Sequence, residues 1–458
     1  MSIISMNNGM NRKGFVLCLF VTILSQTGVL GQTAIAKDSL LSLEACINMA
    51  LERNHSMVMA SNTLKMADNN VSAAPFLPTV DITSAQTGSN LSTSTYQADG
   101  DLLGGRSRSN AWRNSLNVNW TLFDGLAMFA TSEKQRVLLE QGRYQYMAVA
   151  ENLVKAISEQ YYYIITLHNQ VNLLQELVSI SQERYQQALT RYRIGADSGL
   201  EYKQAGIYLN SDSSSLLLQR ELLKNAYIEL NRLMNVPLTS HYVIEDAIIP
   251  APTLNLENLM ASAMEQNTSL LSIETGEQVA LLDTKLAKAE RLPLLRASAG
   301  YGLNLSQSPY LPAKYDQSNG LNAGLTLTVP LFKGFEVNRK VANAKLEAAN
   351  ANLELTSARQ QVESELLQLY NVYMNNLRMI DFEEQNRDAA SMNLEAAMEK
   401  YRLGSLAGIE FRDYQLSYLN ASDRKLKALY QTKISEITLR LLAGELFARS
   451  TPLDKPGR

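Results

Sequence analysis

The side chains best suited to catalysis or metal binding are few in this chain and widely spaced. The three histidines are His55, His168 and His241. The chain has no His-Glu-x-x-His, Gly-x-Ser-x-Gly or phosphate-binding Gly-Lys motif, so no local pattern supports an enzyme. Met57, Met59 and Met66 could bind copper or silver, but methionine at helical spacing more often fills a core. We therefore predict no catalytic site, no cofactor and no metal site.

The overall composition excludes several classes of protein. Of the 458 residues, 46% are hydrophobic and 19% are charged, which fits neither a disordered acidic chain nor a membrane protein of many apolar helices. The net charge of −3 is too mild to suggest a nucleic-acid partner. Beyond the first 36 residues, no stretch is apolar enough for a membrane-spanning helix. Any contact with a membrane must therefore be made by strands.

Residues 1–36 have the features of a secretory signal peptide. Arg12 and Lys13 supply a basic start, and residues 14–24 form an apolar run of suitable length. Ala34 and Ala36 place small residues at the positions that define cleavage, and residues 29–31 offer a second possible site. The run is too short to cross ~30 Å of hydrocarbon as an anchor. We therefore expect an exported protein.

The two cysteines, Cys18 and Cys46, do not form a disulfide framework. Cys18 could mark a lipoprotein, but bulky Leu17 precedes it where such a processing site needs a small residue. Because removal of the signal peptide leaves one cysteine, no disulfide can form within one mature chain.

The distribution of prolines predicts two very long helices. The eleven prolines lie at positions 75, 78, 237, 250, 252, 293, 309, 312, 330, 452 and 456. Residues 124–194 and 336–403 lie in the proline-free stretches and are rich in Ala, Leu, Glu, Gln, Lys and Arg, which favour helix. Each stretch could extend ~100 Å as one helix at 1.5 Å per residue. Helices of this length imply coiled-coil packing.

The chain is also internally duplicated. Residues 43–54 resemble 256–267, the sequence Phe-Asp-Gly at 123–125 matches Phe-Lys-Gly at 332–334, and Tyr-Arg-Ile-Gly at 192–195 matches Tyr-Arg-Leu-Gly at 401–404. A repeat this long indicates two equivalent halves and not a short-period solenoid. We assign the first repeat to residues 37–245, the second to 246–447 and a short tail to 448–458.

Each half contains a pair of segments in which apolar and polar residues alternate. They lie within residues 78–96, 116–122, 295–306 and 321–329. A period of two predicts strands with one apolar face, and their length approaches the ~10 residues of a tilted membrane strand. Trp112 and Trp120 share one face ~26 Å apart, close to the height of the apolar band of a membrane barrel. The alternative is a soluble antiparallel sheet capped by helices.

Four strands per chain are too few to close a membrane barrel, since the smallest known barrels have eight. Open strand edges are not tolerated in lipid, so the chain must oligomerise. A dimer would supply eight strands and a trimer twelve. Only the wider barrel leaves a channel, because side chains fill the interior of an eight-stranded one.

The order of these elements resembles the TolC-type outer-membrane factor family over nearly the whole mature chain. The most specific residues are Pro78 and Pro293 before strands, Leu-Phe-x-Gly at 122–125 and 331–334, and the turns that end at Gly195 and Gly404. The resemblance implies a mixed α/β membrane protein, in which a long α-helical coiled-coil barrel joins a transmembrane β-barrel completed by oligomerisation. It further implies a homotrimer in outer-membrane lipid that extends into the periplasm. There it would work with a periplasmic adaptor (membrane fusion) protein and an inner-membrane pump in efflux or type I secretion.

The resemblance also implies a gate at the periplasmic tips of the hairpins. Glu410 and Asp413 occupy the positions of a constricting carboxylate ring, while Tyr401 and Glu201 occupy a link that holds the gate shut. Leu406 stands where the family has a gate arginine, so one closing contact is absent or replaced. Alternatively, Glu201 and Glu410 only stabilise the positive N-terminal ends of their helices.

Two other classes of protein remain as alternatives. A trimeric surface fibre or adhesin also combines a coiled coil with a barrel, but its strands normally lie at one chain end, whereas these are interleaved with helices in both halves. An outer-membrane enzyme would require a catalytic cluster, and no such cluster is evident. The resemblance leaves the cargo open among drugs, metal cations, proteins and lipids.

Overall fold

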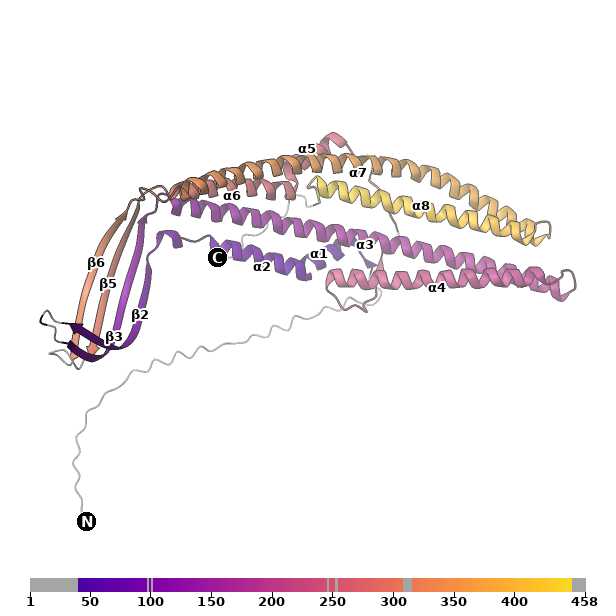
Figure 1. Ribbon diagram of the computed structural model, residues 1–458. Coiled ribbons are helices and arrows are strands. Elements are labelled where there is room, and N and C mark those ends of the chain that lie inside the picture. Colours follow the sequence, from indigo (N-terminus) through magenta and orange to yellow (C-terminus); the bar gives the residue numbers. More distant parts are fainter. Residues whose placement is uncertain are drawn as a thin grey trace, which may run out of the picture.

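The computed structural model describes residues 40–96, 99, 102–244, 247–251, 254–307 and 315–446. The expected signal peptide and C-terminal tail lie outside these residues. The molecule is elongated, with a small sheet at one end and the tips of two helical hairpins at the other (Figure 1). The strands expected to contact the membrane therefore lie at one end of the molecule, and the hairpin tips expected to form the gate lie at the other, which we call the tip end.

Two long helical hairpins form the body of the molecule. The helices α3 (Ala127–Arg193) and α7 (Glu336–Arg402) each have 67 residues, as the proline-free stretches predict. Each is followed by a 35-residue helix, α4 (Leu200–Met234) or α8 (Gly408–Leu442), which packs back along it. Within the described part of the chain, no helix combines the length and apolar character needed to cross a membrane.

Shorter helices precede each strand pair and are joined by equivalent asparagines. They are α1 (Leu43–Arg53), α2 (His55–Asn70), α5 (Leu256–Gln266) and α6 (Thr268–Ala289). The side chains of Asn54 and Asn267 cap α2 and α6 by accepting a backbone N–H. Their amide groups also donate to the carbonyl oxygens of Leu233 and Leu442, at 2.8 Å and 2.9 Å. The same cap therefore ties the same elements together in both repeats.

The strands form one antiparallel sheet in the order β2-β3-β5-β6. Their bounds are β2 Thr79–Tyr96, β3 Leu102–Phe123, β5 Leu294–Gln307 and β6 Tyr315–Thr328. The strand β3 begins earlier than expected because Gly, Arg, Ser and Asn in residues 102–115 obscure the alternation. The sequence did not predict the parallel pair β1 (Leu40–Leu41) and β4 (Val243–Ile244), whose strands are too short for a periodic signal.

The two strand hairpins have the same register. Thr79 pairs with Asn119 in the first hairpin, and Leu294 pairs with Thr328 in the second. Positions in β2 and β5 therefore correspond with a displacement of 215 residues, and positions in β3 and β6 with a displacement of 209. These displacements match the repeats Pro78/Pro293 and Phe123/Phe332 seen in the sequence.

The register brings the apolar positions of all four strands onto one face of the sheet. Val118 in β3 is opposite Val80 on one side and Ala299 on the other, and Ala299 is opposite Ala323. The same face carries Ile82, Leu116, Tyr301, Leu321, Leu325 and Leu327. Leu321 and Leu325 are 79% and 71% exposed, so none of the residues that the structure describes covers that face. The predicted alternation is confirmed.

The core lies where the short helices meet the long ones, and it is repeated. One cluster surrounds Ile157 and Leu230, and the other surrounds Leu366 and Leu439. The hydroxyl of Tyr161 donates to the carbonyl oxygen of Leu41 at 3.0 Å, and that of Tyr370 donates to the carbonyl oxygen of Leu254 at 3.1 Å. These tyrosines correspond under the displacement of 209, so each repeat holds its N-terminal segment against its long helix in the same way.

Candidate functional site

Both helical hairpins reverse direction at a glycine in the left-handed conformation. Gly195 has φ +76° and Gly404 has φ +77°, a backbone conformation in which a residue with a side chain would be strained. The N–H of Gly195 donates to the carbonyl oxygen of Tyr192, and that of Gly404 donates to the carbonyl oxygen of Tyr401. This arrangement is a common way to end a helix. The two predicted tip turns are confirmed as turns, and they lie at the same end of the molecule (Figure 1).

A hydrogen bond joins the two hairpins just inside these tips. The hydroxyl of Tyr401, at the end of α7, donates to Glu201 Oε1, at the start of α4, over 2.8 Å. Tyr401 is fully buried and stacks on Phe411 with 5.2 Å between ring centroids. Burial, helped by Glu201, raises the pKa of Tyr401 to about 12. The hydroxyl therefore keeps its proton near neutral pH and remains a donor.

The buried guanidinium of Arg184 lies beside this bond. Arg184 comes from α3 and is 2% exposed, with its Cζ 5.1 Å from the ring centroid of Tyr208 and 5.8 Å from that of Tyr401. A Cβ added to Gly408 would lie 2.6 Å from Arg184 Nη2 and 2.7 Å from Glu201 Oε1. Glycine at position 408 therefore lets the arginine and the carboxylate come together above the first turn of α8.

A second, deeper link is a buried ion pair. Arg412 of α8 donates two hydrogen bonds to Asp212 of α4, each 2.7 Å long, and the two side chains are 11% and 5% exposed. Ser181 of α3 donates to the same carboxylate at 2.5 Å. Two-pronged charge-assisted pairs of this kind are strong and directional. This pair fixes the first turns of α8, of which Arg412 is the fifth residue, against the first hairpin.

Less buried contacts complete the joint between the hairpins. Arg191 of α3 donates to the carbonyl oxygen of Tyr401, at the end of α7, over 2.7 Å. Arg402 lies 2.8 Å from Glu183, but these side chains are 46% and 41% exposed, so the pair contributes little to stability. The buried contacts therefore hold the hairpins together more strongly than the exposed ones.

The predicted gate residues fall into two groups. Tyr401 and Glu201 are in contact, whereas Glu410 and Asp413 stand on the exposed face of α8 and do not meet them. Glu410 lies in the first turn of its helix, where a carboxylate is favourable in any case. Leu406 packs against the apolar cluster that contains Tyr401 and so fills space without a charge.

Met57, Met59 and Met66 do not gather into one site. Met57 is buried in the first core cluster, whereas Met59 and Met66 are 61% and 59% exposed on α2. In the described part of the chain, no group of three or more His, Cys, Asp or Glu residues is placed to hold a metal ion.

Sequence reasoning missed three of the residues that join the hairpins. Arg184, Asp212 and Arg412 look like ordinary charges of long amphipathic helices, and their partners are 200 or more residues away or come from another helix. Only the contact between hairpins reveals that they are buried. The same contact explains the glycine at position 408, which had no evident role in the sequence.

Comparison with known proteins places this architecture in a family. The sequence profile of the family described as "Outer membrane efflux protein" matches residues 46–236 and 259–445, one match in each repeat. The chain is similar to "Outer membrane protein TolC" of Escherichia coli (strain K12), with 23% identity over 374 residues that cover 76% of this chain and 73% of that protein. It is also similar to "Protein CyaE" of Bordetella pertussis, with 22% identity over 90% of this chain and 86% of that protein.

Among solved structures, the fold is similar to that of the Campylobacter jejuni CmeC outer membrane channel. The TM-score is 0.74 at 18% sequence identity, and the match covers 89% of this chain and 87% of the other. The repeat of helix, strand pair and long hairpin thus agrees with the sequence profile over most of the chain. The chain therefore belongs to the outer membrane efflux protein family and is a channel protein of the outer membrane.

Proposed function

We infer that the chain forms a homotrimer whose twelve strands close into one barrel, while its helical hairpins form a tunnel through the periplasm. The observation that supports this most directly is the four-stranded sheet: in the described part of the chain its apolar face is uncovered, and its edge strands β2 and β6 are each paired on one side only. Unpaired backbone groups are costly in lipid, so the edges require partners from other copies. Three copies supply enough strands for an open channel, whereas two do not.

The assembly is tested by the mass of the purified protein in a mild detergent. Light scattering corrected for detergent should give three times the mass of the mature chain, because an open four-stranded sheet cannot persist in an apolar environment. A uniform monomer would contradict the proposal, and a dimer would contradict the open channel.

The tip end is proposed as the gate of this tunnel. In a trimer, Glu410 and Asp413 would supply six carboxylates around the narrowed periplasmic opening. The hydrogen bond between Tyr401 and Glu201 would hold the two hairpins of each copy in the closed arrangement. A buried Arg184 beside Glu201 would supply positive charge from within the same copy, where Leu406 provides none.

The partners follow from the same arrangement. The channel would receive its cargo from a periplasmic adaptor protein and an inner-membrane pump, in efflux or type I secretion. The helical tips are the surface that such partners would reach, because they lie at the far end from the strands (Figure 1). A surface fibre is disfavoured because the strands interrupt both repeats and do not lie at one end of the chain.

The orientation of the sheet is tested by placing a charge on each face. Leu325 belongs to the apolar face, and its neighbour Thr326 to the polar face that would line the lumen. Leu325→Arg should cost ~2–4 kcal/mol if the site lies near the middle of the bilayer, and should reduce the yield of trimer. Thr326→Arg is the matched control and should assemble almost normally. Val118→Arg and Asn117→Arg form a second pair in β3, and equal tolerance on both faces would contradict the orientation.

A further inference from the structure

Two equivalent turns follow the strands β3 and β6, and the described residues cover only the first of them. Gly125 and Leu126 have φ +72° and +71°, and Gly334 and Phe335 have φ +56° and +62°, so both turns use two left-handed residues in succession. A non-glycine residue in this conformation is uncommon, and its presence at both places shows that the turns are the same structure.

The segment before β5 packs against the first turn. A Cβ added to Gly125 would lie 2.6 Å from the carbonyl oxygen of Ala289 and 2.7 Å from the Cβ of Leu292. Glycine is therefore required at position 125 for two reasons: its backbone conformation and the close approach of a neighbouring chain segment.

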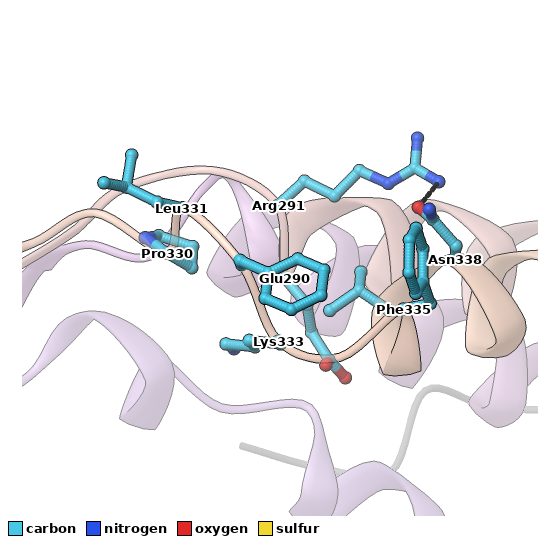
Figure 2. Close-up of a pocket in the computed structure, with 9 residues that line it drawn as sticks. Glu290, Arg291, Pro330, Leu331, Lys333, Phe335 and Asn338 are labelled. Atoms are coloured by element: carbon cyan, nitrogen blue, oxygen red, sulfur yellow. Dashed lines mark hydrogen bonds between the residues drawn. The ribbon is translucent and has the colours of Figure 1, made fainter.

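Within the described residues, nothing covers the second turn. A Cβ added to Gly334 would have no atom within 4 Å. Leu331, Phe332 and Phe335 around it are 92%, 73% and 70% exposed. An open hollow of about 240 Å³ lies beside the turn, and Leu331 points away from the rest of the chain (Figure 2). A surface this apolar marks a contact with something outside the chain.

The internal repeat identifies the segment that would cover this turn. With the displacement of 215 residues, Ala289 corresponds to Ala74 and Leu292 corresponds to Leu77. These residues precede β2 at the opposite edge of the sheet, and Leu77 is 61% exposed. The turn at Gly334 is thus uncovered at the β6 edge of the sheet. At the β2 edge lies segment 74–77, which is equivalent to the segment that covers the first turn and which is itself exposed at Leu77. A single chain cannot bring its own two edges together, so the covering segment must come from a second copy.

We propose that β6 and the turn at Gly334 dock against β2 and the segment 74–77 of a second copy, in the register that joins β3 to β5 within one chain. In that register Asn117 lies opposite Gly300 and Val118 lies opposite Ala299. The corresponding pairs between copies are Thr326 with Ala85 and Leu327 with Ser84. Gly334 would then lie against Ala74 and Leu77 of the neighbour. The proposal rests on the oligomeric barrel proposed above and specifies its joint.

Two features of the edge strands agree with this register. It places Leu325 and Leu327 on the same face as Val80 and Ile82, so the apolar face continues across the joint. A slip of one residue would reverse the faces of one strand relative to the other. The register also places Pro330, which has no N–H, at the position of Thr121, where the ladder between β3 and β5 becomes irregular.

The register can be tested with pairs of cysteines in the full-length protein. Residues directly opposite on antiparallel strands have Cα atoms ~4.5–5.5 Å apart, which suits a disulfide. Ala85 and Thr326 of one copy are separated by two other strands, or ~14 Å at ~4.8 Å per spacing, so any disulfide must join two copies. The native Cys46 is fully buried, which raises the pKa of its thiol to about 12 and makes it unreactive.

The two designed pairs are Ala85→Cys with Thr326→Cys and Ser84→Cys with Leu327→Cys. After mild oxidation, at least one of them should give covalent dimers and trimers on non-reducing gels. The control, Ala85→Cys with Asn322→Cys, keeps the same face but shifts the register by four residues, or ~14 Å along the strand at ~3.4 Å per residue. It should remain monomeric on the gel.

Crosslinking of the control, or failure of both designed pairs in a protein that is trimeric in detergent, would overturn the register while leaving the proposed trimer intact. Absence of the trimer before oxidation would overturn both.

Discussion

Replacing Arg412 with alanine should lower the free energy of unfolding by about 3–5 kcal/mol, because it leaves Asp212 buried without its counter-charge. The thermal midpoint, followed by circular dichroism at 222 nm, should fall well below that of the wild type. Arg402→Ala is the matched control, since it removes an arginine from a half-exposed pair near the same tips. Surface pairs contribute only ~0–1 kcal/mol, so this variant should melt close to the wild type.

A double-mutant cycle separates the ion pair from other effects of losing Arg412. Asp212→Ala and Arg412→Ala should each be strongly destabilising, whereas the double variant should lose much less than the sum of the two. Additive losses would show that the charges do not interact and that Arg412 matters only through its packing against Tyr208. Because the pair joins α8 to the first hairpin, we also expect Arg412→Ala to raise the resting conductance of the channel.

The second large effect is expected at the opening between the tips. Glu410→Ala with Asp413→Ala should weaken cation selectivity and abolish block by multivalent cations, because it removes six carboxylates from one narrow aperture of a trimer. Alanine is a good helix former, so the first turn of α8 should be retained. Reversal potentials in a salt gradient, measured in planar bilayers with and without a trivalent cation, would show the change.

The control for this variant is Glu354→Ala with Glu363→Ala, which removes the same charge from exposed positions in the middle of α7. It should leave selectivity and block unchanged. If the two acids at the tip serve only as charges at a helix start, their loss would lower thermal stability and leave selectivity as in the wild type. That result would refute the gate while leaving the fold unaffected.

The sequence predicted those parts of the fold that depend on local pattern. The proline-free stretches located α3 and α7 to within a few residues, and the alternation around Leu325 and Val118 identified the face of the sheet on which they lie. Both signals arise from the period of one helix or one strand, which a single sequence records directly. The repeated Tyr-Arg-x-Gly located both tip turns for the same reason.

What the sequence could not predict depends on contacts between distant segments. Asp212 and Arg412 are 200 residues apart, and each occupies a position on its helix that could equally face water. The burial of Arg184 depends on Gly408, whose missing side chain leaves room for the guanidinium. The short pair β1 and β4 has only two residues in each strand, too few for any pattern. Such features are determined by how the hairpins pack and not by local propensity.

The current through single purified assemblies in a planar lipid bilayer would show whether this chain is a gated channel of the outer membrane. We expect discrete steps of small conductance that favour cations, because the acidic tips restrict an otherwise wide tunnel. We also expect a larger conductance for Tyr401→Phe with Glu201→Gln, which removes the hydrogen bond between the hairpins. Insertion without discrete current steps, or an anion-selective pore unchanged by these substitutions, would contradict a gated channel.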